Sequence, residues 1–388
     1  MKTLKFSLLP AIAALAIAGA ASADPMASPA MTAPLSANPN PFSVDSGTPL
    51  GKIYVGGALT GMAMVQNHQL ATDKKSYLDL TNAQVIVQST SGPIQFYVQA
   101  GSYSQPYLAV PYMKSTEAVT NNFGAVPVAY LKFQATPELS FLGGKLPTLI
   151  GDEYTFSFQN MNVFRGLLVF QEPAISRGFQ ATYAKGPLTV SASWNDGYYS
   201  NKLNWVSGSV TYVLNPKNTF VVSGGSALSK SGKTSFTTFP PLNNDWIANA
   251  IWTYSDGPVL ISPYFQYTKT RKHEDLGFPA GYTVGGAVLA KYSLTPTFSL
   301  AGRVEYEKTH SDACSATAVA CAPTSFLLGV NSKAWTFTVT PTWQKGIFFV
   351  RGEGSYVHGS SIPPGAGFGA TGAEKSQVRG VVETGVLF

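Results

Sequence analysis

The chain has 388 residues, a formal net charge of +6 and a mean hydropathy of +0.06, and only 12% of its residues are charged. Soluble globular domains carry roughly 25% charged residues. The low charge, together with 37 glycines and 19 tyrosines, favours a β-barrel whose outer wall faces lipid. The net charge is too small to indicate a nucleic-acid partner.

The first 23 residues have the pattern of a secretory signal peptide. Lys2 and Lys5 precede an apolar run over residues 6–20, and the small residues 21–23 form a cleavage site. Beyond residue 23 no apolar stretch approaches the length that a membrane-spanning helix needs. The mature chain is therefore either soluble or crosses a membrane as a barrel.

Residues 24–49 are rich in Pro, Ala and Ser and poor in periodic hydrophobic residues. Such a segment cannot bury enough apolar surface to fold alone. We expect it to be a flexible leader on the periplasmic side, and its composition is also compatible with a plug in the lumen of a barrel.

From Lys52 onward, tight turns rich in Gly and Pro recur at intervals of roughly 30 to 50 residues. Each interval has room for two strands of about 9 to 11 residues and one longer loop, which is the asymmetry of an outer-membrane barrel. Counting strands in this way predicts an all-β fold for residues 50–388, a transmembrane antiparallel β-barrel of about 16 strands with both chain ends on the short-turn side. The turns lie at 91–93, 136–138, 185–187, 215–217, 256–258, 294–296 and 345–346.

Residues 143–178 interrupt this regular pattern. A connection of that length is uncommon in a compact domain unless it has a function. It also interleaves phenylalanines with charged residues, which favours a loop packed against apolar groups beneath it and polar groups inside a pore. We interpret it as a long constriction loop folded inward, with the pore-constriction candidates Asp152, Glu153, Arg165, Glu172 and Arg177.

Several predicted strands carry charges on the face opposite their apolar residues. A basic residue on the lipid face at mid-membrane would cost roughly 2 to 4 kcal/mol, so these side chains are expected to point into the lumen. Bracing of the wall by paired charges and selection of solutes both remain open as their role. The lumen-wall candidates are Lys132, Arg303, Glu305, Glu307, Arg351, Glu353, Arg379 and Glu383.

Two further features lie towards the end of the chain. In an exported protein, Cys314 and Cys321 predict one disulfide that closes a surface loop. The last strand places Val378 and Val382 on one face and ends at the aromatic Phe388 on that lipid side. This ending resembles the signal that the outer-membrane assembly machinery recognises, and with the signal peptide it indicates the outer membrane of a Gram-negative bacterium.

The sequence over residues 139–205 resembles the β-barrel porin family described as OmpL-like. The similarity is specific over the constriction loop and the strand and loop SASWNDGYYSNKLNW that follow it, and diffuse over the other strands. The resemblance implies an outer-membrane porin without a cofactor, through which small hydrophilic solutes or ions diffuse passively. Its expected partners are outer-membrane lipid, the barrel assembly machinery and those solutes, with a homo-oligomer possible.

Two other function classes are compatible with the sequence, an outer-membrane barrel enzyme such as a surface hydrolase and a secreted all-β binding protein. The enzyme would draw on histidines in the predicted outer loops. No spacing links these histidines into a metal site or a catalytic group, so the sequence predicts no catalytic residue and no metal. The histidines are His68, His273, His310 and His358.

Overall fold

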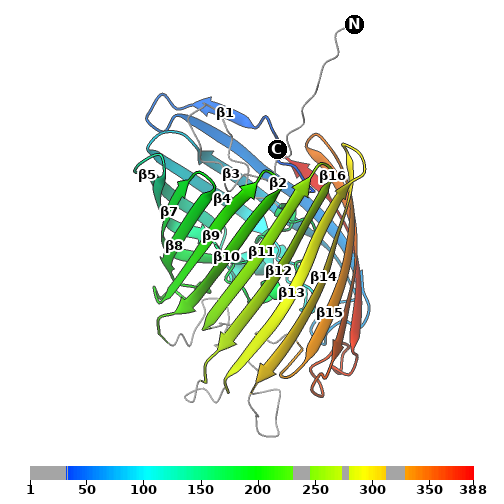
Figure 1. Ribbon diagram of the computed structural model, residues 1–388. Helices are drawn as coiled ribbons and strands as arrows, with labels where there is room; N and C mark the ends of the chain where they lie inside the picture. Colours follow the sequence, from blue (N-terminus) through cyan, green and yellow to red (C-terminus); the bar gives the residue numbers. More distant parts are fainter. Residues whose placement is uncertain (1–31, 33, 230–244, 273–278, 312–327) are drawn as a thin grey trace.

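The computed structural model describes residue 32 and residues 34–229, 245–272, 279–311 and 328–388. The predicted signal peptide, His273 and the cysteines Cys314 and Cys321 lie outside these ranges. The described chain forms one antiparallel sheet of seventeen strands, and sixteen of them close into a barrel (Figure 1). The prediction of an antiparallel β-barrel of about 16 strands is therefore confirmed.

Most strands are long enough to cross a bilayer at a tilt, which takes about 9 to 11 residues, whereas β1 has four residues, β5 seven and β8 eight. None of the helices among the described residues is both long enough and apolar enough to span a membrane. The elements are β1 Phe42–Asp45, β2 Lys52–Gln66, β3 Ser76–Ser89, β4 Ile94–Tyr103, α1 Ser115–Asn121, β5 Val128–Gln134, β6 Leu139–Pro147, η1 Ser157–Gln159, η2 Leu168–Gln171, β7 Ile175–Lys185, β8 Leu188–Asn195, β9 Trp205–Asn215, β10 Asn218–Ala227, β11 Trp246–Asp256, β12 Val259–Thr270, β13 Gly281–Ser293, β14 Phe298–Ser311, β15 Lys333–Lys345, β16 Phe348–Ser360 and β17 Ser376–Leu387.

The barrel closes between its first and last long strands. β17 pairs with β2 from Arg379 opposite Gln66 to Leu387 opposite Ala58. All seven predicted turns connect neighbouring strands, and the C-terminal end of the chain lies on the side of these short turns (Figure 1). The long loops are on the opposite side, which in an outer-membrane barrel is the extracellular side.

The segment before the barrel differs from the flexible leader that its composition predicts. Strand β1 pairs with residues 52–55 of β2, where β17 no longer reaches, so it satisfies backbone groups on an otherwise open edge. Farther back, the backbone N–H of Thr32 donates to the carbonyl of Gln159 at 2.8 Å. Leu35 is only 2% exposed. Described residues of this segment therefore contact the barrel wall and the loop that carries Gln159.

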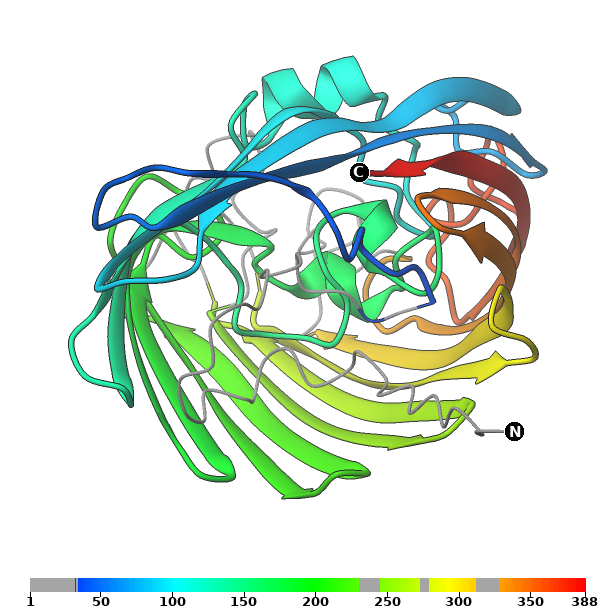
Figure 2. The ribbon, with the colours of Figure 1, turned by 90° about the horizontal axis from the view of Figure 1, so that it is seen from above.

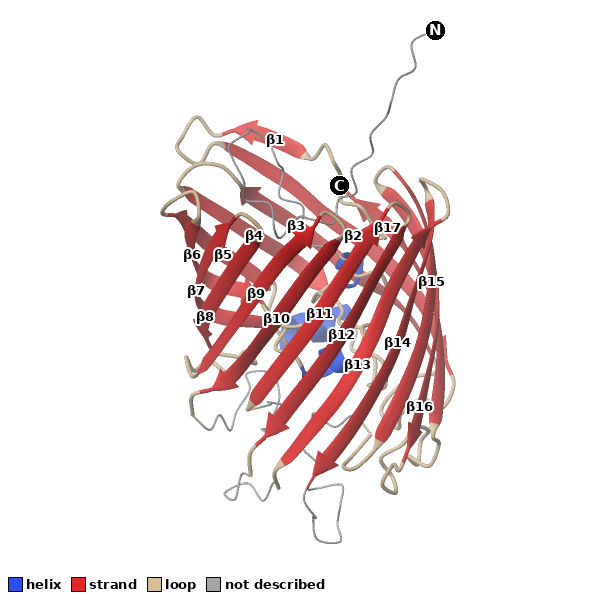
Figure 3. Ribbon diagram, viewed as in Figure 1, coloured by secondary structure: helices blue, strands red, loops and turns tan. Residues whose placement is uncertain are grey.

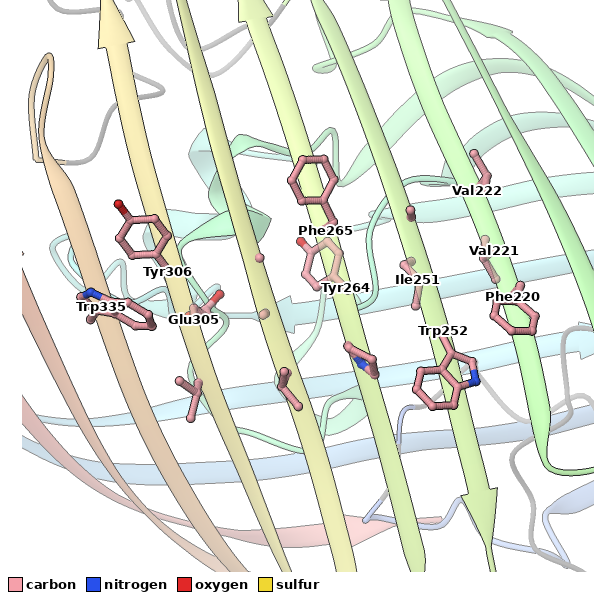
Figure 4. A pocket seen from close by; sticks show the side chains of 16 residues that line it. Phe220, Val221, Val222, Ile251, Trp252, Tyr264, Phe265, Glu305, Tyr306 and Trp335 are labelled. Carbon is pink, nitrogen blue, oxygen red and sulfur yellow. The ribbon is translucent and has the colours of Figure 1, made fainter.

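The two faces of the sheet alternate as the sequence predicts. On β17, Val378 and Val382 are exposed on the outer surface, whereas Arg379 and Glu383 are buried in the interior. Figure 4 shows the same alternation on the other side of the barrel, where Tyr264 and Phe265 leave opposite faces of β12. The outer face is therefore apolar and the interior polar, which is the arrangement of a barrel in lipid.

Candidate functional site

Residues 148–174, which connect β6 to β7, are called the internal loop below. Viewed along the barrel, its short helices η1 and η2 lie inside the ring of strands (Figure 2), and a side view shows the same (Figure 3). Phe156, Phe158 and Phe164 of the loop are each at most 1% exposed. The loop thus has its own apolar packing within the barrel.

Charged side chains of β16 and β17 hold the first half of this loop. Arg351 donates to the backbone carbonyls of Ser157 at 2.8 Å and Asn160 at 2.7 Å. Its Nε also donates to Glu383 at 2.6 Å, and Glu383 accepts the hydroxyl of Ser157 at 2.9 Å. One buried ion pair on the wall therefore satisfies both the backbone and a side chain of the loop.

Glu353, on β16, holds the middle of the loop by accepting hydrogen bonds from backbone N–H groups of the loop. The carboxylate accepts the N–H groups of Val163 at 2.5 Å and Phe164 at 3.0 Å. It also accepts the hydroxyl of Thr340 on β15 at 2.8 Å. Hydrogen bonds to a charged acceptor are stronger than neutral ones, so this carboxylate fixes the turn of the loop at this point.

Strand β14 provides the next attachment. Arg303 donates to Glu153 at 2.6 Å and to the carbonyl of Phe164 at 2.9 Å. Glu305 lies beside Arg303, with its carboxylate 3.2 Å from the guanidinium, and accepts the N–H of Leu167 at 3.2 Å. Arg303, Glu305 and Glu153 are all nearly inaccessible to solvent. They therefore form a buried charge cluster that couples the loop to the wall.

Strand β12 is attached to the loop near its beginning and again in its second half. Ser262 donates to Asp152 at 2.6 Å, and Tyr264 donates to Glu172 at 2.6 Å. The side-chain amide of Gln266 donates to the carbonyl of the loop residue at position 168 at 2.9 Å. Sequence patterning places Ser262 and Gln266 on the polar face of their strand but does not single them out, and it misses Tyr264, because a tyrosine on that face has no distinctive signal.

Burial within the barrel changes the acidity of three loop carboxyl groups. Loss of solvent raises the pKa of Asp152 to about 6, partly offset by the hydroxyl of Ser262. It also raises the pKa of Glu153, against the opposing effect of Arg303. Burial raises the pKa of Glu172 well above its usual range, against the opposing hydrogen bond from Tyr264. The loop therefore carries carboxyl groups whose charge depends on pH near neutrality.

A second loop, between β4 and β5, reaches the internal loop, and the sequence does not predict this contact. The backbones of Tyr107 and Arg165 form an isolated β-bridge. The guanidinium of Arg165 lies 3.7 Å from the centre of the Tyr107 ring. Arg379 of β17 donates to the carbonyls of Tyr107 and Val110, both at 2.6 Å. Arg379 thus holds this second loop.

The remaining candidates lie apart from these attachments. Arg177, at the start of β7, pairs with Asp196 at 2.7 Å and lies 3.8 Å from the centre of the Tyr199 ring, so it is not grouped with the other four loop candidates. Lys132 is partly exposed on β5. Glu307 is buried on β14, and among the described residues no hydrogen bond joins it or Lys132 to the internal loop.

The histidines do not come together in the described part of the chain. His68 contacts the carbonyl of Ser376 through Nδ1 at 2.7 Å. His310 packs on Tyr282, and His358 lies near Tyr356. Each has a local contact in a different place, so these three do not form a joint site.

Comparison with known proteins gives one family match. The sequence profile of the family described as "Putative beta-barrel porin-2, OmpL-like" matches residues 52–388. No curated protein matches the sequence.

Solved structures of outer-membrane proteins share the fold at low sequence identity. A loop-deletion mutant of OmpT from Vibrio cholerae has a TM-score of 0.57 at 12% identity, covering 87% of this chain and 99% of that one. An anion-selective porin from Comamonas acidovorans has a TM-score of 0.57 at 11% identity, with 87% and 99% covered. OmpF from Salmonella typhi, in complex with daunomycin, has a TM-score of 0.54 at 10% identity, with 89% and 100% covered.

Proposed function

Because the chain belongs to the OmpL-like family of β-barrel porins and is a porin channel of the Gram-negative outer membrane, we propose that small hydrophilic solutes diffuse through it past a constriction formed by the internal loop. The observation that carries this proposal is the attachment of the loop to the inner wall by Arg303, Arg351, Glu353 and Glu383. A loop fixed in this way narrows the cross-section of the lumen.

We propose that the solute path runs between the internal loop and the wall made by β7 to β10, which the loop approaches through apolar packing in clusters that include Trp205, Val221 and Ala227. The hydrogen bonds described above join the loop to side chains of β12, β14, β16 and β17 instead. Hydroxyl and amide groups dominate this wall, and they replace part of the hydration shell of a polar solute without fixing it by charge. They are Gln180, Thr182, Ser191, Ser193, Ser207, Ser209, Thr211 and Ser223.

The charged wall residues act first as supports in this proposal. Arg303, Arg351 and Glu383 are each at most 1% exposed, and their polar groups are engaged with the loop or with one another. Asp152 is only partly buried, so of the loop carboxyls it is the one best placed to act on a passing ion. In this proposal, the selection of ions therefore depends more on the internal loop than on the charged residues of the wall.

Passive diffusion requires neither a cofactor nor a catalytic group, and we propose that the protein is not an enzyme. The alternative of a surface hydrolase needs a nucleophile and a base within hydrogen-bonding distance. Its support in the described residues is weak, because His68, His310 and His358 contact different partners. We propose contacts with outer-membrane lipid and with the barrel assembly machinery because of the outer-membrane location, and a homo-oligomer as a separate proposal.

Removal of part of the loop tests the constriction. Deletion of residues 151–164 is expected to raise single-channel conductance several-fold, because it removes η1 and the segment bound by Arg351 and Glu353. Planar-bilayer recordings give the conductance, and heat-modifiable gel migration verifies a folded barrel. Unchanged conductance in a folded deletion variant would refute the constriction and leave the porin assignment standing.

A further inference from the structure

Three lysines on the outer face of the barrel lie near its long-loop end, two of them directly opposite each other on β14 and β15. They are Lys269 of β12, Lys308 of β14 and Lys333 of β15, and all three are exposed. Their strands lead into or out of the long loops, on the side away from the C-terminus (Figure 1). In an outer-membrane barrel this is the level of the outer-leaflet headgroups. These three residues are called the basic patch below.

The charges of the basic patch are not balanced within the described chain. Lys308 and Lys333 are direct cross-strand partners, and like charges in that position repel one another. Glu305 and Glu307, the acidic residues nearest along β14, are buried on the opposite, inner face. Among the ion pairs of the described residues, none involves a lysine of the patch.

Two cationic groups elsewhere near the ends of the barrel have carboxylate partners. Lys217, at the short-turn end, pairs with Asp256 at 2.7 Å. Arg177, near the long-loop end of β7, pairs with Asp196 at the same distance. The basic patch therefore differs from these positions, and an anion from outside the described chain would remove its repulsion.

Aromatic rings surround the patch and mark its depth in the membrane. Trp246 packs on Tyr267 with ring centres 5.4 Å apart, and Tyr267 packs on Tyr282 at 5.8 Å. Tyr306 and Trp335, shown in Figure 4, lie 4.6 Å apart on the two strands that carry Lys308 and Lys333. Amphipathic rings of this kind gather at the membrane–water interface, where lipid phosphates are also found.

We propose that the basic patch binds the phosphate groups of an outer-leaflet lipid. Its ammonium groups pair with the lipid phosphates, while the rings and the apolar strand surface below them contact the acyl chains. A lipid suits this surface better than a free anion, because the charges border an apolar wall. The lysines lie on the face opposite the lumen, so the proposal does not depend on the solute path.

Binding of a phosphorylated lipid by the purified, detergent-folded barrel tests the proposal. The probe is lipid A with two phosphates, titrated and detected by native mass spectrometry. The variant combines Lys269→Gln, Lys308→Gln and Lys333→Gln, and is expected to weaken binding at least tenfold, because each basic group near a lipid surface contributes about 1 kcal/mol. The matched control combines Lys185→Gln, Lys217→Gln and Lys345→Gln at the short-turn end and is expected to bind as the wild type does.

Two further arms separate the possible ligands. Lipid A without phosphates is expected to bind weakly to wild type and variant alike, and inorganic phosphate at millimolar concentration is expected not to displace the phosphorylated lipid. Equal binding by the patch variant, equal binding of the dephosphorylated lipid, or displacement by inorganic phosphate would each overturn the proposal. Heat-modifiable migration establishes folding, and unchanged single-channel conductance of the variant separates this result from the porin function.

Discussion

At the scale of single residues, the interior charges are structural parts of the loop attachment. Arg351 contacts two loop carbonyls and Glu383 at once. Removing one partner of a buried ion pair leaves the other charge uncompensated and costs about 3 to 5 kcal/mol. The sequence left open whether these charges brace the wall or select solutes, and the geometry favours bracing.

Arg351→Met is expected to loosen the internal loop while leaving the barrel closed. The loss of the guanidinium leaves the loop carbonyls of Ser157 and Asn160 without this donor, and it leaves Glu383 without its cationic partner. Single-channel recordings should show larger current fluctuations and a higher mean conductance. Arg271→Met, a change of the same kind at an exposed position, is the control, and equal noise in the two variants would contradict the bracing role.

The raised pKa of Asp152 predicts an ion selectivity of the pore that depends on pH. This pKa is raised to about 6 by burial, so the carboxyl is neutral below that pH and negative above it. Raising the pH from 5 to 7.5 is expected to move the reversal potential in asymmetric salt toward cation preference. Asp152→Asn should remove most of this movement, whereas Asp256→Asn at a short turn should not. A full pH response in Asp152→Asn would exclude the carboxyl as its origin.

At the scale of elements, the final strand determines whether the barrel closes. The backbone of Phe388 exchanges hydrogen bonds with Gly57 of β2 at 2.8 and 3.1 Å. A Cβ added at Gly57 would lie 2.6 Å from the Phe388 ring, so this glycine permits the close approach of the two strands. The terminal aromatic is therefore part of the seam as well as an expected assembly signal.

Phe388→Ala is expected to lower the amount of folded barrel in the outer membrane several-fold, because it removes the terminal ring from the seam and from the recognised end of the chain. Heat-modifiable migration of outer-membrane fractions measures this amount. Val382→Ala, which shortens another exposed side chain of the same strand, is the control. Normal levels of folded Phe388→Ala protein would show that the aromatic end is dispensable.

At the scale of the whole molecule, the closed ring of strands is expected to keep the barrel folded when a covalent bond within one outer loop is broken. Sixteen strands pair in a ring, and β17 meets β2 over nine residue pairs, so no long edge remains to unravel. The predicted bridge between Cys314 and Cys321 would close so short a ring that it contributes at most roughly 2 to 3 kcal/mol.

Reduction is therefore expected to leave the barrel folded. Heat-modifiable migration with and without reductant tests this, and alkylation of the native protein tests the bridge itself. Labelling of both cysteines before reduction would rule the bridge out, and loss of the folded band on reduction would contradict the small contribution assigned to it.

The sequence alone determined the strands, their faces and the closed barrel. Residues at alternate positions must face either lipid or a polar interior, so the pattern on β17, from Val378 to Phe388, already specifies both sides. The turns at Gly and Pro specify how the strands follow one another, because these residues fit turn conformations that other residues resist. The position of the lumen charges followed from the cost of placing them in lipid.

The tertiary structure decided how the interior is used. A lumen-facing Arg or Glu has the same sequence pattern whether it meets water or a loop, so only the three-dimensional structure shows that Arg351 and Glu353 bind the backbone of the internal loop. The same holds for the contact between Tyr107 and Arg165 and for the packing of Leu35 against the barrel. These contacts join segments far apart in the chain, and local periodicity carries no information about which of them meet.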